Sequence, residues 1–188
     1  MTEYSRRQVV QSLAALGLLS SPGLVASQSV AKSLSLQQTG STGALNLAPE
    51  IAQALTDSPL IYLTPIKLGG DYSRCQSEVW FVVVDGEILV CTDQTSWRAQ
   101  AVMAGLQRTQ IWVGDVGVWE ADFKAHLALP SFRATARIAQ SPKLIDAALD
   151  AFGDQYPVQW LLWGNRFRKG LANGARVMLA YRPSSAPL

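Results

Sequence analysis

Thr92, Ser96 and Arg98 place two hydroxyls and a guanidinium within one short segment near the middle of the chain. Serine is a favourable helix N-cap, and the pattern after Ser96 predicts a helix through Leu106. A helix N-terminus presents unpaired amide donors and a positive dipole end, so a hydroxyl and a guanidinium beside it would hold a phosphate well. The alternative from the same spacing is that Ser96 only caps the helix and Arg98 is solvated.

The segment before these residues predicts a β-hairpin. Two runs rich in β-branched residues, Val79–Val84 and Glu87–Thr92, flank Asp85-Gly86, a dipeptide typical of two-residue hairpin turns. A continuous pairing from that turn places Trp80 opposite Cys91. The hairpin would thus deliver a threonine at the end of its second strand, directly before the loop and the predicted helix.

The two cysteines of the chain are Cys75 and Cys91. In the predicted hairpin Cys75 would lie opposite Ser96, beyond the strand, so the pattern argues against a simple cross-strand disulfide. A longer-range approach of the two thiols stays open, and an oxidising compartment would permit it.

Other kinds of site find little support in the sequence. The chain has one histidine, His126, so a zinc site built from several histidines is not available. The alternation over Val118–Leu127 predicts a half-buried strand with His126 on its polar, solvated side. No nucleophile elbow, P-loop or dinucleotide-binding fingerprint occurs. The net charge is +2 with scattered basic residues, which does not resemble a nucleic-acid-binding surface.

The remaining pattern predicts strands with helices at the margins. Helices are expected over Pro49–Leu55, from Ser141-Pro142 to Phe152, and as a short turn or helix over Val158–Trp163; strands are expected over Leu60–Leu68, Gln110–Val113, Phe132–Ile138 and Ala175–Tyr181. About six strands with two or three helices predict a small antiparallel barrel of the α+β class. The basic segment Gly164–Gly170 is expected to be a loop, either solvated or reaching an anionic group.

The first residues of the chain predict an export signal. Ser5-Arg6-Arg7-Gln8-Val9-Val10 precedes an apolar segment, Leu13–Leu19, which is too short to span a membrane but fits the core of a signal peptide. An ordinary amphipathic helix is the alternative. We expect a twin-arginine signal over residues 1–31, a flexible lead-in over 32–48, and one domain over 49–188. The twin-arginine export machinery would then carry the folded protein to the periplasm or another extracytoplasmic space.

The hairpin-to-helix segment resembles the FMN-binding split-barrel superfamily, whose best-known member type is pyridoxamine 5'-phosphate oxidase. In that group the second hairpin strand ends in a threonine, and a Ser-x-Lys/Arg element at the next helix binds the FMN phosphate. The resemblance implies that Thr92, Ser96 and Arg98 bind this phosphate, with Trp97 in the variable place between them. It also implies that Val79, Trp80 and Phe81 lie along the flavin ring.

The resemblance covers about residues 58–182, and only the hairpin-to-helix motif in it is specific. It implies an antiparallel split β-barrel, a homodimer, and a flavin-dependent oxidoreductase acting on a small-molecule redox substrate. A flavin performs the redox chemistry itself, so no catalytic acid or base is obligatory and none is assigned. The pyridoxal-phosphate-binding residues of the oxidase have no clear match, so its substrate does not carry over. Related barrels bind a deazaflavin or haem, so a non-catalytic exported protein that binds haem, a deazaflavin or a partner is the alternative.

Overall fold

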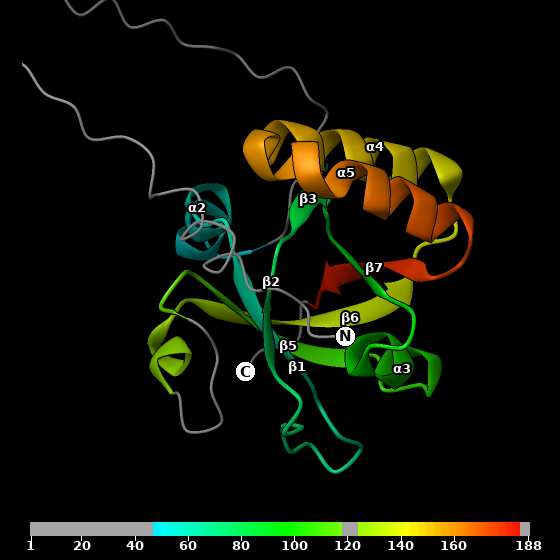
Figure 1. Ribbon diagram of the computed structural model, residues 1–188. Coiled ribbons are helices and arrows are strands. Elements are labelled where there is room, and N and C mark those ends of the chain that lie inside the picture. The colour runs from blue at the N-terminus through cyan, green and yellow to red at the C-terminus, as the bar shows by residue number, and fades with distance from the viewer. Residues whose placement is uncertain (1–46, 118–123, 185–188) are drawn as a thin grey trace, which may run out of the picture. The chain divides into compact units, whose positions relative to one another are not determined.

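The computed structural model of the chain describes residues 47–117 and 124–184 (Figure 1). The predicted signal peptide and nearly all of the predicted lead-in therefore lie outside the described residues. Internal contacts divide the chain into two units, Met1–Ser41 and Thr42–Leu188, and the described residues all belong to the second. None of the helices in the described ranges is long and apolar enough to cross a membrane.

An antiparallel sheet forms the body of this unit. Within the described residues it has seven strands in the order β2-β1-β5-β6-β7-β4-β3. Their bounds are β1 Ile61–Pro65, β2 Ser77–Val79, β3 Val82–Val84, β4 Glu87–Asp93, β5 Arg108–Val113, β6 Ser131–Ile138 and β7 Arg176–Pro183. The expected antiparallel α+β barrel is confirmed, with one strand more than the six predicted.

The sheet closes almost completely on itself. Strands β2 and β3 are its two edges, yet only Trp80 and Phe81 separate them in the chain. Three Cα–Cα steps of about 3.8 Å allow at most roughly 11 Å between Val79 and Val82. The sheet must therefore curl until its edges nearly meet, which leaves a barrel with one open seam between β2 and β3.

The predicted hairpin is correct at its turn. Val84 pairs with Glu87 as expected. Asp85 and Gly86 both have positive φ, at 51° and 74°, as a two-residue turn of this kind requires. Strand β3 therefore ends, and β4 begins, where the sequence placed them.

The hairpin prediction is wrong before Val82. Val79 pairs with Ile61 of β1, so Ser77–Val79 belongs to the opposite edge of the sheet. Trp80 is in no strand, and Cys91 lies opposite Met178 of β7. The chain crosses the seam at Trp80 and Phe81. The residues on both sides of this crossing are apolar and mostly β-branched, so the sequence does not show that the strand is interrupted.

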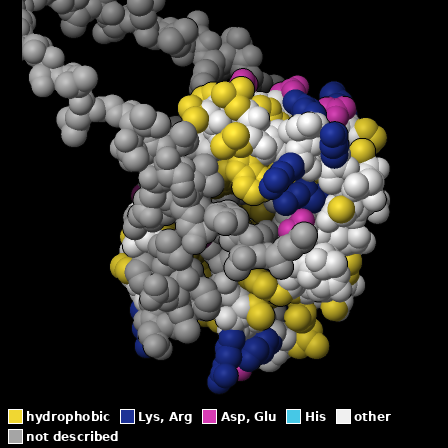
Figure 2. All heavy atoms as spheres, viewed as in Figure 1, with side chains coloured by type: hydrophobic (Ala, Val, Ile, Leu, Met, Phe, Trp, Pro, Cys, Tyr) yellow, Lys and Arg dark blue, Asp and Glu magenta, His cyan; other side chains and the backbone are white. Residues whose placement is uncertain are grey.

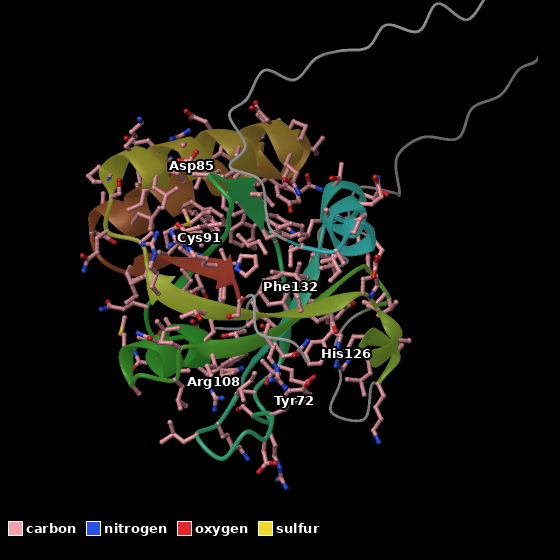
Figure 3. All side chains as sticks on the ribbon, turned by 180° about the vertical axis from the view of Figure 1, so that it is seen from behind. Tyr72, Asp85, Cys91, Arg108, His126 and Phe132 are labelled. Atoms are coloured by element: carbon pink, nitrogen blue, oxygen red, sulfur yellow. The ribbon has the colours of Figure 1, made fainter. Side chains whose placement is uncertain are left out.

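The barrel interior is filled by alternate side chains of the strands. Phe132 of β6 lies at its centre and is 5% exposed (Figure 3). The other large members of this core are Ile61, Leu63, Phe81, Ile88, Val90, Ile111, Val113, Leu179 and Tyr181. Burial of these apolar surfaces is the main force that holds the curled sheet together.

Two helices cover the outer face of β3, β4 and β7 (Figure 1). They are α4 (Pro142–Gln155) and α5 (Pro157–Ala172). As predicted, Ser141 caps α4, and its hydroxyl oxygen accepts the Leu144 N–H at 3.4 Å. The helices pack on the sheet through a second apolar cluster that includes Leu149, Phe152 and Phe167.

The expected loop over Gly164–Gly170 is wrong, because this segment lies inside α5. A Cβ at Gly164 would come within 2.8 Å of the Trp160 ring, and one at Gly170 within 2.8 Å of the Arg176 side chain. Both glycines thus permit close packing inside the helical layer. A glycine at a buried helix position and a glycine in a loop look alike in sequence.

Three shorter elements complete the described fold: α2 (Pro49–Asp57), α3 (Trp97–Met103) and a 3₁₀ helix, η1 (Ala125–Ala128). The first two confirm the helices predicted to begin at Pro49 and after Ser96. The strand predicted over Val118–Leu127 falls partly on residues 118–123, outside the described residues. Its remainder is wrong, since η1 occupies it and His126 is only 2% exposed. Tertiary packing of the His126 ring overrides the two-residue alternation there.

Candidate functional site

The residues predicted to hold a phosphate meet beside the seam. Thr92 lies near the end of β4, Ser96 is the N-cap of α3, and Arg98 is in the first turn of that helix. Ser77 of β2 joins them from the other side of the seam. We call these four residues the seam cluster.

Hydrogen bonds link the seam cluster into a directed chain. The Arg98 guanidinium donates one N–H to Thr92 Oγ1 and another, at 3.0 Å, to Ser77 Oγ. The Thr92 hydroxyl then donates to Ser96 Oγ at 3.0 Å. Arg98 thus connects the edge strand β2 with β4, the strand next to the opposite edge β3.

Ser96 is the outer end of this series of hydrogen bonds. Its Oγ accepts from Thr92 and also from the Ala99 N–H at 3.4 Å. Because both of these are accepted bonds, the hydroxyl hydrogen of Ser96 remains available to an acceptor outside the cluster. Ser96 is half-buried, so it is the member of the cluster that a ligand could reach.

The charge of the cluster lies almost entirely inside the protein. Arg98 is 3% exposed and Thr92 is fully buried. The alternative of a solvated Arg98 is therefore wrong, whereas the capping role of Ser96 is confirmed. Burial raises the pKa of Tyr181 far above its usual value, and the positive charge of Arg98 opposes that rise. The Arg98 cation therefore acts on the barrel interior as well as on its own hydrogen-bond partners.

The residues predicted to lie along a flavin ring occupy the crossing of the seam. Phe81 is fully buried, and its N–H and C=O both pair with the Tyr156 hydroxyl, at 3.2 and 2.7 Å. Trp80 stacks on the Tyr156 ring with centroids 5.3 Å apart. Val79 packs, partly buried, against the barrel core. Contact of these three residues with a flavin stays a prediction, and Phe81 could offer its backbone only if Tyr156 withdrew.

Trp97 also turns toward the protein. It packs against the barrel core, and the Arg98 guanidinium carbon lies 5.4 Å from the centroid of its ring. This arrangement supports the position of Arg98 through a cation–π contact. The described contacts of Trp97 are thus all with the protein itself, and they support the fold around Arg98.

Sequence reasoning missed Ser77 and Tyr156. Ser77 is 21 residues from Arg98, and Tyr156 is 75 residues from Phe81. Ser77 meets Arg98 because the sheet curls, and Tyr156 meets Phe81 because the helical layer packs on the sheet. A single serine or tyrosine at such separations carries no local signal of that role.

A second cluster of polar and aromatic side chains surrounds the single histidine. His126 stacks on Tyr62 with centroids 5.5 Å apart and meets Trp112 edge-on at 5.0 Å. We call these three residues the aromatic cluster; it lies away from α4 and α5, where Figure 3 labels His126. Burial lowers the pKa of His126, which favours its neutral form.

Tyr62 ties the aromatic cluster to the neighbouring loop. Its hydroxyl donates to the Gly117 carbonyl and accepts the Val116 N–H at 3.2 Å. Burial raises the pKa of Tyr62, and the nearby charges of Glu78 and Asp115 add to that rise. The phenol is therefore a neutral hydrogen-bonding group that fixes the loop after β5 against β1.

Cysteine and metal chemistry receive no support from the described part of the chain. Cys75 and Cys91 are not joined by a disulfide. Within residues 47–117 and 124–184, no group of three or more His, Cys, Asp or Glu side chains is placed to hold a metal ion.

Comparison with known proteins gives matches only at the level of three-dimensional structure. No family model matches the sequence, and no curated protein matches it significantly. The heme storage protein HutZ from Vibrio cholerae is similar in structure, with a TM-score of 0.51 and 15% identity over 74% of this chain and 92% of that one. A protein of unknown function from Agrobacterium tumefaciens has a TM-score of 0.50 and 16% identity over 74% of this chain and 58% of that one.

A candidate pyridoxamine 5'-phosphate oxidase from Listeria innocua has a TM-score of 0.46 and 9% identity, over 72% of this chain and 91% of that one. At identities this low, structural similarity establishes the fold alone. The curled antiparallel sheet, its seam and its flanking helices form an α+β split-barrel fold, and HutZ is similar to it in overall structure.

Proposed function

We propose that this chain is an exported FMN-binding split-barrel protein that uses the flavin as an oxidoreductase. The observation that carries the proposal is the directed chain of hydrogen bonds from Arg98 through Thr92 to Ser96. A cation at its inner end polarises each hydroxyl in turn, so the outer hydroxyl becomes a stronger donor. A phosphate monoester is an acceptor suited to such a donor.

The residues present fit the phosphate end of FMN better than its ring. The Ser96 hydroxyl would donate to a phosphate dianion, and the buried Arg98 would supply a compensating charge behind it. At the ring end, Phe81 is committed to Tyr156, which leaves Val79 and Trp80 as the candidates for ring contact. FMN would supply the transfer of electrons, while the protein would supply position and electrostatics. The substrate of that reaction would be a small redox-active molecule.

The test uses two matched serine variants. Ser96→Ala and Ser141→Ala each remove an N-cap whose oxygen accepts an N–H at 3.4 Å, so each should lose about 1 kcal/mol of stability. Ser96→Ala should lose somewhat more, because Ser96 Oγ also accepts from the Thr92 hydroxyl. Only Ser96→Ala should weaken FMN binding, by roughly tenfold for one lost hydrogen bond to a charged group. Flavin fluorescence quenching measures the affinity, and thermal unfolding measures the stability.

Two outcomes would count against FMN. If the parent protein is colourless and FMN causes no change on titration, the flavin proposal fails. If Ser96→Ala and Ser141→Ala bind FMN equally well, the phosphate is held elsewhere.

Export and dimerisation form part of the same proposal. The paired arginines support export through the twin-arginine machinery, a route that carries folded proteins, so FMN could be inserted in the cytoplasm first. Replacement of Arg6 and Arg7 by lysine should retain the precursor inside the cell, as cell fractionation would show. A homodimer is proposed from the resemblance, and light scattering at known protein concentration would test it.

Haem is the second candidate ligand, and the aromatic cluster favours it. A neutral imidazole is the form that ligates haem iron, and burial keeps His126 neutral. The ring is only 2% exposed, so ligation would require the η1 segment to open. A haem absorption band that survives Ser96→Ala but is lost in His126→Ala would favour haem over FMN.

A further inference from the structure

The outward face of α5 carries apolar side chains that the fold does not bury. Leu161 is 86% exposed, Leu162 is 59% exposed and Val158 is 56% exposed. Their spacing of three and four residues places them on one side of the helix. Figure 2 shows hydrophobic side chains gathered on the surface over the helical layer, with Lys and Arg side chains beside them.

The second half of the same face is cationic. Arg166, Arg168 and Lys169 are exposed, and α5 contains no acidic residue. The acidic side chains of this layer belong to α4, where Asp150 lies 3.9 Å from Arg168. The exposed face of α5 is thus apolar in its first half and basic in its second half. All the charges that α5 itself contributes are positive.

Two partly buried tryptophans of α5, which pack against the second apolar cluster, contact basic side chains of the exposed face. The Arg166 guanidinium carbon is 5.0 Å from the Trp163 ring centroid, and that of Arg168 is 5.5 Å from the Trp160 centroid. These contacts hold both guanidinium groups against the surface of the helix. Leucine, tryptophan and basic side chains in this arrangement are typical of helices that lie at a membrane–water interface.

We propose that α5 docks the protein on an anionic lipid bilayer. Val158, Leu161 and Leu162 would enter the boundary between headgroups and acyl chains, and Arg166 and Lys169 would contact lipid phosphates. A second copy of the chain suits this face less well. A stable dimer buries roughly 800 Å² per partner over 20–30 residues, far more than three apolar side chains supply, and α5 offers no carboxylate to a partner's arginines.

The test reports on α5 itself, because the apolar N-terminal segment of the chain could also attract lipid. In the full chain with Cys75 and Cys91 replaced by serine, an environment-sensitive fluorophore is attached at Leu161→Cys or, as the control, at Leu68→Cys. Leu68 is another exposed leucine, at 87%, in the turn after β1. The probes are vesicles of equal parts phosphatidylglycerol and phosphatidylcholine, and vesicles of phosphatidylcholine alone.

We expect the fluorophore at position 161 to shift to the blue with the anionic vesicles, and that at position 68 to stay unchanged. Arg166→Gln with Lys169→Gln should weaken vesicle binding roughly 25-fold, about fivefold for each charge. The matched pair Lys67→Gln with Arg74→Gln removes the same charge from the other surface and should change binding little. Circular dichroism confirms that each variant is folded.

Three results would overturn the proposal. One is an unchanged spectrum at position 161 with anionic vesicles, whether or not the chain sediments with them. Another is an equal response at positions 161 and 68. The third is a blue shift at position 161 that follows protein concentration without lipid, which would make this face a contact between copies.

Discussion

The seam cluster and the aromatic cluster bury polar groups in opposite ways. At the seam, the charged Arg98 is held by hydroxyls of Ser77 and Thr92, and these bonds join two strands that the sheet order keeps apart. In the aromatic cluster, the imidazole of His126 is kept neutral among rings. The seam cluster is stable only while the Arg98 charge keeps its hydrogen-bond partners. The aromatic cluster is stable only while His126 carries no charge. They should therefore respond differently to substitution and to pH.

Loss of the seam charge should have the largest effect. Arg98→Ala leaves the Ser77 and Thr92 hydroxyls without their donor and removes the connection across the seam, so we expect a loss of about 3 kcal/mol in the free energy of unfolding. Arg98→Lys keeps the charge but not the forked donor, and should lose less. Urea unfolding measures both. Equal losses in the two variants would mean that the forked geometry, rather than the charge, stabilises the seam.

Tyr62→Phe tests the hydrogen bonds of the aromatic cluster while keeping its ring. The change leaves the Gly117 carbonyl and the Val116 N–H without their phenol partner, so we expect a loss of about 1–2 kcal/mol in unfolding free energy. Thermal unfolding measures the change. A loss as large as that of Arg98→Ala would contradict the idea that the charged cluster contributes more.

The pH dependence separates the two clusters most sharply, although its effect is the smallest near neutrality. Because the pKa of His126 is lowered on folding, the unfolded chain binds its proton more readily. Its contribution to stability is complete above about pH 6.5 and falls as the pH drops below that value, by at most about 1.4 kcal/mol per pH unit. His126→Phe should flatten this slope below about pH 6.5, as unfolding at several pH values would show. An unchanged slope would mean that another group carries it.

Local features of this chain were predictable because their causes are local. Ser96 and Ser141 cap helices through their own hydroxyls, and Asp85-Gly86 adopts the positive φ values of its turn. The apolar stripe of α4 likewise follows from its spacing. Each of these depends on residues within a few positions of one another.

The misplaced elements all depend on distant contacts. The break at Trp80 and Phe81 follows from the curl of the whole sheet and from Tyr156, which pairs with the Phe81 backbone. The extension of α5 through Gly164 depends on the Trp160 ring, which fills the space of a missing side chain. The alternation of apolar and polar residues and the local composition each describe one segment at a time. They therefore could not predict the strand break at Trp80 and Phe81 or the extension of α5.

The sequence by itself determined the helix caps, the Asp85-Gly86 turn and that strands with marginal helices would form an antiparallel barrel, while phosphate binding by Thr92, Ser96 and Arg98 stays a prediction. Only the tertiary structure decided that Arg98 is buried and reaches Ser77 across the seam, and that His126 is enclosed by aromatic rings. The physical reason is the distance along the sequence over which each interaction acts. Caps, turns and side-chain periodicity act over a few residues, whereas burial and the pairing of edge strands depend on which distant segments the curled sheet brings together.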